Sequence, residues 1–407
     1  MLDSIYSAYT GLLSFNDALN VLSNNVANMN TPGFKSSDVT FRDLFYKYSS
    51  DGGQQSTLNS QVGEGTQTGG TRVNFADGQL GNTGNPLDVG ISGNGFFVLK
   101  DATSTYYTRA GQFDVDAKGY LIDKTSGARV QAITSGKQLQ DIQLSTVQTS
   151  PAKATGTVNF VGNLSRGATS DQISSITVYD SVGGSHTLSL SLANADAATA
   201  GVWQVQVQDE NGATIGTGEI HFNADGSPAT GFNTVTFSLA PANVAATQIT
   251  LNFGDPGSFL AATNFSGGTT SDLKVNNQDG YAAGSLLNTT VDAQGFVTLK
   301  YSNGQTNKGP QLALAWFNNL QGLREFGNEL FTNPTGMPVI LGSANGQVMG
   351  TLTSNEVELS NVNLTQQFTE LVIIQRGYQS SSQVISVANQ MIQQLVDMRT
   401  GGGGGAG

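Results

Sequence analysis

Apolar residues recur every three or four positions from the start of the chain to residue 29. The steps between them run 3, 4, 3, 3, 4, 3, 4 and 3, which places them on one face of an α-helix. At roughly 1.5 Å per residue, this helix would be about 40 Å long. We expect it to end at residues 28–33, because Pro32 moves Thr31 out of the helical region and Gly33 allows a turn. The stripe consists of Leu2, Ile5, Tyr9, Leu12, Phe15, Leu19, Leu22, Val26 and Met29.

The C-terminal end of the chain shows the same spacing. A second helix is expected after an N-cap supplied by residues 361–363 or by Thr365. Gln375 and Ser382 continue the register where the middle of the stripe turns polar. After Arg399 a glycine run carries no fold information and is expected to be flexible. The apolar members are Leu364, Phe368, Leu371, Tyr378, Ile385, Ala388, Ile392, Leu395 and Met398.

Between the two helices the hydrophobic period changes from about 3.6 to two. Short runs of alternating apolar and polar residues are separated by turn-forming tripeptides that end in glycine, which is typical of antiparallel β-structure. We therefore predict a mainly β fold with α-helical termini. The clearest runs are 71–75, 96–99, 175–179, 187–192, 203–207 and 248–253, and the turns include 117–119, 210–212, 224–226 and 302–304.

An internal echo suggests how the β region is divided. Residues 115–120 resemble residues 291–296, and each run leads into an apolar strand. Similar hairpins on both sides of 148–272 favour one β-domain with a second one inserted, although this short motif is also a common hairpin sequence. The expected layout is an N-terminal helix (1–30), a polar linker or extended connector (31–70), an inner β-domain (71–147 and 273–357), an inserted outer β-domain (148–272), a C-terminal helix (358–400) and a flexible glycine tail (401–407).

Composition narrows the range of functions. A net charge of −12 with only 18 lysines and arginines argues against binding to nucleic acid or to an anionic membrane surface. Cysteine is absent, so disulfides, thiolate metal ligands and thiol nucleophiles are excluded. His186 and His221 stand alone in strand-like runs and are interpreted as structural residues. No apolar run is long enough to span a bilayer, and the N-terminus lacks a secretory signal.

Three short motifs invite functional readings that the sequence does not support. The glycine-rich run 90–95 lacks the spacing of a phosphate-binding loop and precedes a strand. Three glycosylation sequons, at Asn163, Asn264 and Asn363, are interpreted as chance matches. Asp114 and Asp116 are interpreted as solvated turn carboxylates rather than as a glycosidase pair. We therefore expect no catalytic, cofactor-binding or metal-binding residues, and a protein that is not an enzyme.

The terminal stripes carry the strongest functional information. A helix with one apolar stripe must bury it, and the two helices can pair with each other. A pair of helices cannot cover both stripes, so the remaining apolar surface requires other subunits, and contacts between non-identical faces give open helical arrays. An intramolecular hairpin packed on the β-domains is the alternative. The large side chains from Leu2 to Val26 and from Leu364 to Leu395 are therefore the expected self-assembly residues.

Residues 22–35 resemble the N-terminal signature of the bacterial flagellar rod and hook proteins. Two further regions match that family in order: residues 85–97 with 107–113, and residues 358–364 with 375–380. The resemblance covers both ends and the inner β-domain. The N-terminal motif residues are Asn24, Asn25, Ala27, Asn28, Thr31, Pro32, Gly33, Phe34 and Lys35.

The middle of the chain indicates which branch of the family this is. Residues 148–272, with the run 178–186, are similar to the hook proteins, whereas the distal-rod members are much shorter. A rod protein and a secreted β-sandwich adhesin or binding module are the alternatives. Where hook proteins are cross-linked covalently a cysteine takes part, so the resemblance implies noncovalent packing in this chain.

The resemblance implies a structural polymer. Terminal helices from many copies would form an inner tube around an export channel, and the β-domains would form outer layers of a curved, flexible joint that transmits motor torque. It also implies a flagellar location after export without a cleaved signal. The implied partners are the chain itself, the distal rod protein, the hook cap protein, the hook–filament junction protein and the export apparatus.

Overall fold

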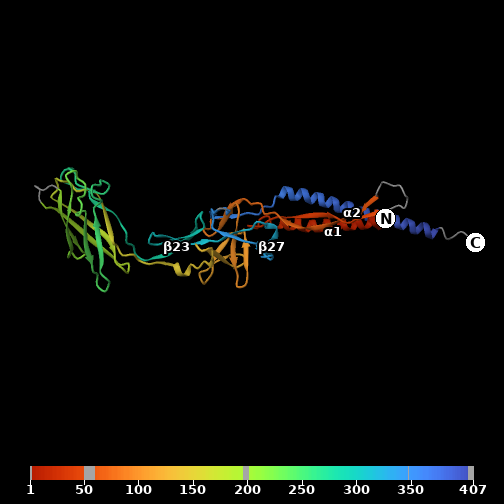
Figure 1. Cartoon of the computed structure of the whole chain (residues 1–407), viewed down its shortest axis with the longest axis horizontal. Coiled ribbons are helices and arrows are strands. Elements are labelled where there is room, and N and C mark those ends of the chain that lie inside the picture. The colour runs from red at the N-terminus through yellow and green to blue at the C-terminus, as the bar shows by residue number, and fades with distance from the viewer. Residues whose placement is uncertain (1, 50–59, 196–200, 347, 402–407) are drawn as a thin grey trace, which may run out of the picture. The chain divides into compact units, whose positions relative to one another are not determined.

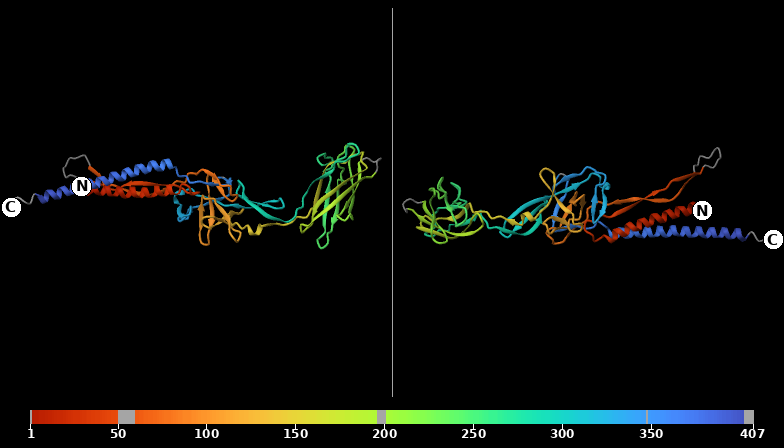
Figure 2. Two further views of the ribbon diagram at one scale, coloured as in Figure 1. Left: turned by 180° about the vertical axis from the view of Figure 1, so that it is seen from behind. Right: turned by 90° about the horizontal axis from the view of Figure 1, so that it is seen from below.

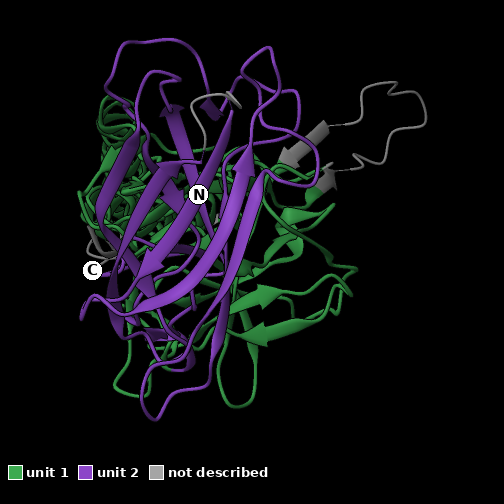
Figure 3. Cartoon of the chain, turned by 90° about the vertical axis from the view of Figure 1, so that its left-hand side faces the viewer, with its two compact units in different colours: residues 1–145, 289–298, 308–407 green, residues 146–288, 299–307 purple. Residues whose placement is uncertain are grey.

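The computed structural model describes residues 2–49, 60–195, 201–346 and 348–401. The chain is mainly β with an α-helix at each end, as predicted. It forms two compact units (Figure 3): residues 1–145, 289–298 and 308–407 make up unit 1, and residues 146–288 and 299–307 make up unit 2. The segment 148–272 falls within unit 2, which also takes in residues 273–288. The Leu2 side chain and the glycines after Gly401 lie outside the described part.

The two terminal helices lie side by side in unit 1 (Figure 1). They are α1 (Leu2–Ala27) and α2 (Leu364–Gly401). α1 ends beside the Asn-Thr-Pro-Gly segment, and Gly33 adopts a left-handed φ of 76°. Asn363 caps α2, because its Oδ1 accepts hydrogen bonds from the backbone N–H of Thr365 (3.1 Å) and Gln366 (3.3 Å). Both ends therefore agree with the sequence signals.

The segment expected to be a connector pairs with itself and follows α1 (Figure 2). It comprises β1 (Ser37–Asp43), β2 (Tyr46–Ser49), β3 (Ser60–Gly63) and β4 (Thr66–Val73). β1 is antiparallel to β4, and the Thr68 hydroxyl donates to Asp17 Oδ2 on α1 at 2.7 Å. Val39 packs on the helices, and the Phe41 ring lies 6.0 Å from that of Phe15. A period-two pattern in a polar segment thus gives the hairpin one apolar side.

The body of unit 1 is a sheet with the path β11–β7–β8–β28–β27. Residues 96–99 of β7 are completely buried, so the glycine-rich run before them leads into a core strand. The core gathers around Phe96, whose ring packs against those of Phe75, Phe317 and Phe331. The strands of this region are β5 (Leu80–Asn82), β6 (Val89–Ser92), β7 (Phe96–Lys100), β8 (Thr105–Thr108), β9 (Phe113–Val115), β10 (Leu121–Asp123), β11 (Arg129–Ile133), β12 (Leu139–Asp141), β26 (Leu314–Trp316), β27 (Arg324–Gly327), β28 (Leu330–Thr332), β29 (Ile340–Gly342), β30 (Thr351–Ser354) and β31 (Glu356–Glu358).

The two echoed runs form the same turn. Asp116 Oδ1 accepts from the N–H groups of residues 118 and 120, and Asp292 Oδ1 accepts from those of residues 294 and 296. Gly119 and Gly295 have φ values of 81° and 85°. Both turns belong to unit 1. The repeat in the sequence therefore corresponds to a repeated local structure.

Unit 2 is a sandwich of two sheets. One is β15–β16–β17–β18, and the other is β19–β20–β14–β21 with β22 beside β14. In β17 the side chains of Trp203, Val205 and Val207 point into the core, while Gln204 and Gln206 between them are exposed. The strands are β13 (Thr149–Ser150), β14 (Thr157–Asn163), β15 (Ser170–Tyr179), β16 (Ser185–Asn194), β17 (Val202–Gln208), β18 (Thr214–His221), β19 (Thr234–Leu239), β20 (Thr247–Asn252), β21 (Ala262–Thr263) and β22 (Lys274–Gln278). β23 (Gly284–Val291), β24 (Phe296–Tyr301) and β25 (Thr306–Leu312) have residues in both units.

The alternating pattern predicts antiparallel pairing throughout, but the structure also contains parallel pairs. β14 is parallel to both β20 and β21. Alternation records which side chains face the core, but it carries no information on strand direction. The direction is set by the long connections that return β20 and β21 to β14.

We expect Phe160→Ala to destabilise unit 2 by about 3–5 kcal/mol, because it removes a large buried side chain from a close-packed core. The Phe160 ring is 1% exposed and is stacked on that of Phe253 at 4.8 Å. Urea unfolding can be followed by Trp203 fluorescence in a Trp316→Phe background, since each unit contains one tryptophan. The exposed Gln172→Ala is the control and should change stability by less than about 0.5 kcal/mol. Equal midpoints for the two variants would contradict the assigned core.

Candidate self-assembly surface

Small residues form the seam between α1 and α2. Ala18 and Ala388 are 1% and 2% exposed. A Cβ added to Gly11 would lie 3.2 Å from Ser381 Oγ, and one added to Gly377 would lie 2.5 Å from the Phe15 ring. Side chains of this size allow the two helices to approach closely, because the distance between packed helices is set by the residues at the contact. At these positions the seam uses little of the large apolar surface of either helix.

A compact apolar cluster lies where α1 and α2 meet and where β1 packs on them. It contains the buried side chains of Ala18, Leu22 and Ile374. Partly buried side chains packed against it are Phe15, Leu19, Val39 and Leu371. Four residues of the predicted stripes, Phe15, Leu19, Leu22 and Leu371, are thus used within the monomer.

The remaining stripe residues lie beside the seam or on the outer surface. Ile5, Leu12, Val26, Leu364 and Ile385 are half-buried. Tyr9 is 53% exposed, and Phe368 is 54% exposed. Tyr378, Ile392 and Leu395 are exposed as well.

The intramolecular seam is displaced by one position from most of each predicted stripe, and the two coincide at Leu22 and Ala388. Sequence reasoning selected these two but missed the other buried positions, most of which carry small or polar side chains. On α1 the buried positions are Ala8, Gly11, Ser14, Ala18, Leu22 and Asn25, and on α2 they are Gln367, Ile374 and Ala388. Their spacing of three and four was the available signal.

The outer faces of the two helices form an exposed apolar surface. Charge is sparse on the two helices, because α1 contains only Asp3 and Asp17 and α2 contains only Glu370, Arg376, Asp397 and Arg399. A shallow groove runs along α2 past Val384, Val387 and Met391. An exposed apolar surface of this kind marks a site of protein–protein contact. Its large side chains are Tyr6, Tyr9, Leu13, Phe368, Val372, Ile373, Tyr378, Val384, Val387, Met391, Ile392, Leu395, Val396 and Met398.

Asn25 ties three elements together at the base of the helix pair. Its side chain is fully buried, and its Nδ2 donates to Ser37 O at 2.8 Å and to Gln367 Oε1 at 3.0 Å. Its Oδ1 accepts from the N–H of Ser37 at 3.0 Å. One amide therefore links α1, β1 and α2. Replacing it would leave several buried polar groups unpaired, which is costly in a core.

A buried ionic cluster joins Lys35, the last residue of the 22–35 motif, to the β-strand region of unit 1. Lys35 Nζ lies 2.5 Å from Glu358 Oε1 and donates to Ala76 O at 2.8 Å. Arg109 lies 3.2 Å from both Glu358 Oε2 and Asp77 Oδ1, and its guanidinium is 5.1 Å from the centre of the Phe96 ring. Burial lowers the pKa of Lys35, and the charge of Glu358 opposes that effect.

The other motif residues shape the path from helix to body. Asn28 Nδ2 donates to Asn24, and the Thr31 hydroxyl donates to Asn28 Oδ1. A Cβ on Gly33 would lie 2.5 Å from the backbone nitrogen of Ala110, so only glycine fits there. Pro32 and Phe34 are half-buried, and Ala27 is exposed.

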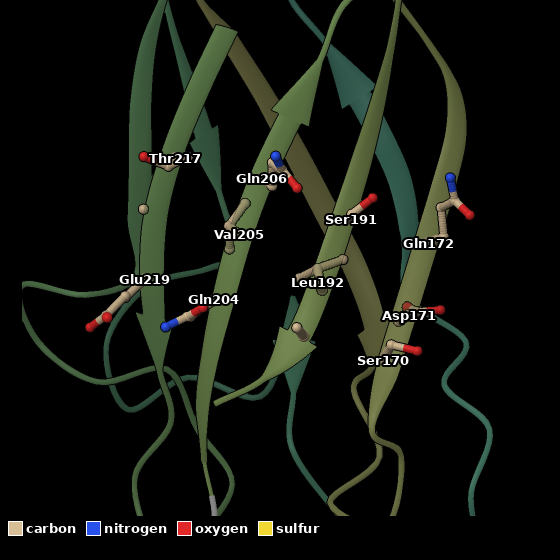
Figure 4. A pocket seen from close by; sticks show the side chains of 12 residues that line it. Ser170, Asp171, Gln172, Ser191, Leu192, Gln204, Val205, Gln206, Thr217 and Glu219 are labelled. Atoms are coloured by element: carbon tan, nitrogen blue, oxygen red, sulfur yellow. The ribbon is translucent and has the colours of Figure 1, made fainter. Parts of the chain in front are cut away.

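The described residues contain no group of three or more His, Asp or Glu side chains that could hold a metal ion. No helix in the described ranges is long and apolar enough to cross a membrane. His186 pairs with Asp180 at 3.1 Å, and His221 is stacked on Phe232. Unit 2 has a groove over the outer face of β15–β18, and half of the residues that line it are glutamine, serine or threonine, with Asp171 and Glu219 beside them (Figure 4).

We expect Gly377→Leu to open the helix pair. In an isolated helix this change would be stabilising, by up to about 1 kcal/mol, because glycine is a poor helix former. Against Phe15 it overpacks the seam and should cost about 1–3 kcal/mol. The measurement is the rate of protease cleavage within α2, which should rise. Gln375→Leu, at an exposed position on the same helix, is the control and should leave the rate unchanged. Slower cleavage of the Gly377 variant would contradict the close seam.

Lys35→Met and Glu358→Gln should each destabilise unit 1 by about 3–5 kcal/mol, because each leaves a buried charge without its partner. The double variant should cost at least about 1 kcal/mol less than the sum of the two, since both act on one interaction. Unfolding can be followed by Trp316 fluorescence in a Trp203→Phe background. Lys308→Met, which removes an exposed ion pair with Asp292, should cost less than about 1 kcal/mol. Strict additivity of the two substitutions would show that the ionic cluster is not coupled.

Four family models match successive parts of the chain. They are the Flagella basal body rod protein model at residues 5–35, the Flagellar hook protein FlgE/F/G D1 domain at 90–163, the Flagellar basal body protein FlaE D2 domain at 159–281 and the Flagellar basal body rod FlgEFG protein C-terminal model at 353–398. The first and last contain most of the helix pair, and the residue 22–35 motif falls in the first.

Full-length relatives show the same similarity. The flagellar hook protein FlgE of Borreliella burgdorferi is 30% identical, over 98% of this chain and 100% of its own length. The FlgE of Treponema pallidum matches with the same identity and coverage. That of Escherichia coli is 31% identical, over 96% of this chain and 99% of its own. The chain belongs to the flagellar hook protein FlgE family.

Proposed function

We propose that this chain is the structural subunit of a flagellar hook and that it polymerises through the outer faces of α1 and α2. The observation that carries this proposal is the mismatch between the two sides of the helix pair. Apart from the cluster around Leu22 and Ile374, the seam inside the monomer is built from small residues, and many large apolar residues of both helices are exposed. A soluble monomer gains nothing from that arrangement, whereas a polymer can bury those residues.

The energetics favour assembly through this surface. Burying a large apolar side chain contributes about 1.5–3 kcal/mol. Residues such as Phe368 and Leu395, about half exposed in the monomer, would each contribute part of this. The helices carry few charges, so little desolvation opposes the contact. Helices from many copies would then form the inner wall of a tube around the export channel.

The β-units would form the outer layers of this tube. The ion pairs in the described part of unit 2 are Lys153–Asp279, Asp180–His186 and Glu219–His221, and each has at least one partly exposed member. Contacts between such surfaces rest on few fixed charges, so neighbours could shift as a curved hook turns and transmits torque. We assign the outer layer to the inserted segment 148–272 and the next layer to 71–147 and 273–357, and we assign the tube to the terminal segments 1–30 and 358–400.

A hook subunit must also meet other parts of the flagellum. By family resemblance, these partners are the distal rod protein at one end, the hook cap protein and hook–filament junction protein at the other, and the export apparatus that delivers the chain. A straight rod is the related alternative. Unit 2, matched by the D2 domain model, favours the hook.

We expect Phe368→Asp and Leu395→Asp to block polymerisation and to leave the monomer folded. A carboxylate on the outer face would have to be buried without a partner in the tube, which is strongly unfavourable. Sedimentation and electron microscopy of polymerised samples measure assembly, and circular dichroism of the monomer checks the fold. Gln379→Asp adds the same charge at an exposed position outside the apolar set and is the matched control. Normal tubes from both aspartate variants of the apolar residues would refute the proposal.

A further inference from the structure

Two Asn-Gly pairs occupy identical turns in unit 2. In one, Asn211 and Gly212 connect β17 to β18, and in the other Asn303 and Gly304 connect β24 to β25. The glycine N–H donates to the carbonyl three residues before it in each turn, at 3.0 and 3.1 Å. Both glycines have a φ of 78°. The backbone geometry of the two pairs is therefore matched.

The surroundings of the two asparagine side chains differ. Asn303 Nδ2 donates to Ala282 O at 2.9 Å and to Ser150 Oγ at 3.3 Å, and its Oδ1 accepts from the N–H of Gln305 at 3.1 Å. A Cβ on Gly284 would lie only 2.5 Å from Asn303 Cγ, so the backbone packs closely against this amide. The Asn303 amide is thus fixed by three hydrogen bonds and by packing.

The Asn211 amide is free by comparison. Asn211 is exposed, and its side chain makes no hydrogen bond with any residue in the described ranges. A Cβ on Gly212 or on Gly304 would meet nothing within 4 Å, so the two turns differ in the surroundings of the asparagine and not of the glycine. The neighbouring Asp209 and Glu210 add two carboxylates to this turn.

We propose that Asn211 is a site of spontaneous deamidation and isoaspartate formation, and that the fold protects Asn303 from the same reaction. The backbone nitrogen of Gly212 attacks Cγ of Asn211, a new C–N bond forms, the bond from Cγ to the amide nitrogen breaks, and ammonia leaves with the proton from the backbone N–H. Water then opens the resulting succinimide at either carbonyl, which gives aspartate or isoaspartate. The reaction needs only the chain and water.

The fold controls the first step of this reaction. Cγ must rotate toward the nitrogen of the following glycine before the attack can occur. Asparagine is one of the thermolabile residues, and this rotation is easiest where its side chain is exposed and unbonded. At position 303 that rotation breaks three hydrogen bonds, whereas at position 211 it breaks none. Each bond contributes measurably to the barrier, so the combined effect should be a rate at least about ten-fold lower at Asn303.

The product would change the turn in two ways. Either product places a third carboxylate beside Asp209 and Glu210. Isoaspartate also inserts an extra methylene into the backbone at the end of the β17–β18 ladder, where the register already shifts between Val207 and Gln208. A subunit that remains in a polymer for long periods would accumulate this change on unit 2.

The test is to incubate the full-length monomer in mildly alkaline buffer and to follow both sites by peptide mapping and mass spectrometry. We expect deamidation at Asn211 at least about ten-fold faster than at Asn303 in the folded protein. Methyl transfer by an isoaspartyl methyltransferase, which labels isoaspartate, should report the same site. Asn211→Ser should remove most of the label from this pair of sites, and Asn303→Ser should not.

A parallel incubation in concentrated urea keeps the proposal falsifiable. Both sites are Asn-Gly, so their rates should become similar once the fold is lost. A rate at Asn303 equal to or above that at Asn211 in the folded protein would overturn the proposal. So would an unmodified Asn211 in the folded protein that reacts readily in urea.

Discussion

The close approach of the two ends of the chain is the constraint from which the rest follows. Apart from the apolar cluster around Leu22, α1 and α2 meet along a seam of glycine, alanine and serine, and even a Cβ at Gly377 would lie 2.5 Å from the Phe15 ring. A seam of small residues uses the helices' smallest side chains internally. Many of the large apolar residues, such as Tyr9, Phe368 and Leu395, are consequently left exposed, where another molecule could cover them. The geometry of the monomer thus leaves exposed the surface through which we propose that the polymer is built.

Polar contacts at the base of the pair fix its register. Asn25 bonds Gln367 across 342 positions of sequence, and Lys35 meets Glu358 on the strand just before α2. A buried charge without its partner is expensive, so these contacts allow one alignment of the two ends and penalise others. Apolar packing alone would tolerate a helix sliding by one turn. The residue 22–35 motif is thereby explained as a set of alignment contacts between helix, hairpin and β-body.

The β-units show which features local sequence specifies and which features depend on the fold. The echoed runs at 115–120 and 291–296 form the same turn because aspartate and glycine act on their own neighbours. The turns at Asn211 and Asn303 also share one backbone geometry for local reasons. Their side chains nevertheless experience different surroundings, because Ala282 and Ser150 are brought to Asn303 by the fold. Similar sequence therefore gives similar backbone, while reactivity depends on what packs around it.

The sequence by itself determined the kinds of element, their order and the family. Hydrophobic period, the Asn363 cap and the turn residues act over a few positions, so they can be read without a structure. It also indicated that the terminal helices pair and that their apolar surface exceeds what the pair can cover. Tertiary structure alone decided which face of each helix turns inward, because this depends on matching side-chain sizes across residues far apart in the chain. It also decided that Leu19 and Leu22 serve the monomer while Tyr9 and Leu395 remain exposed, that the connector folds back along α1, and that two strand pairs run parallel. These features depend on contacts between residues far apart in the chain. The hydrophobic pattern of one segment does not specify which other segment will pack against it.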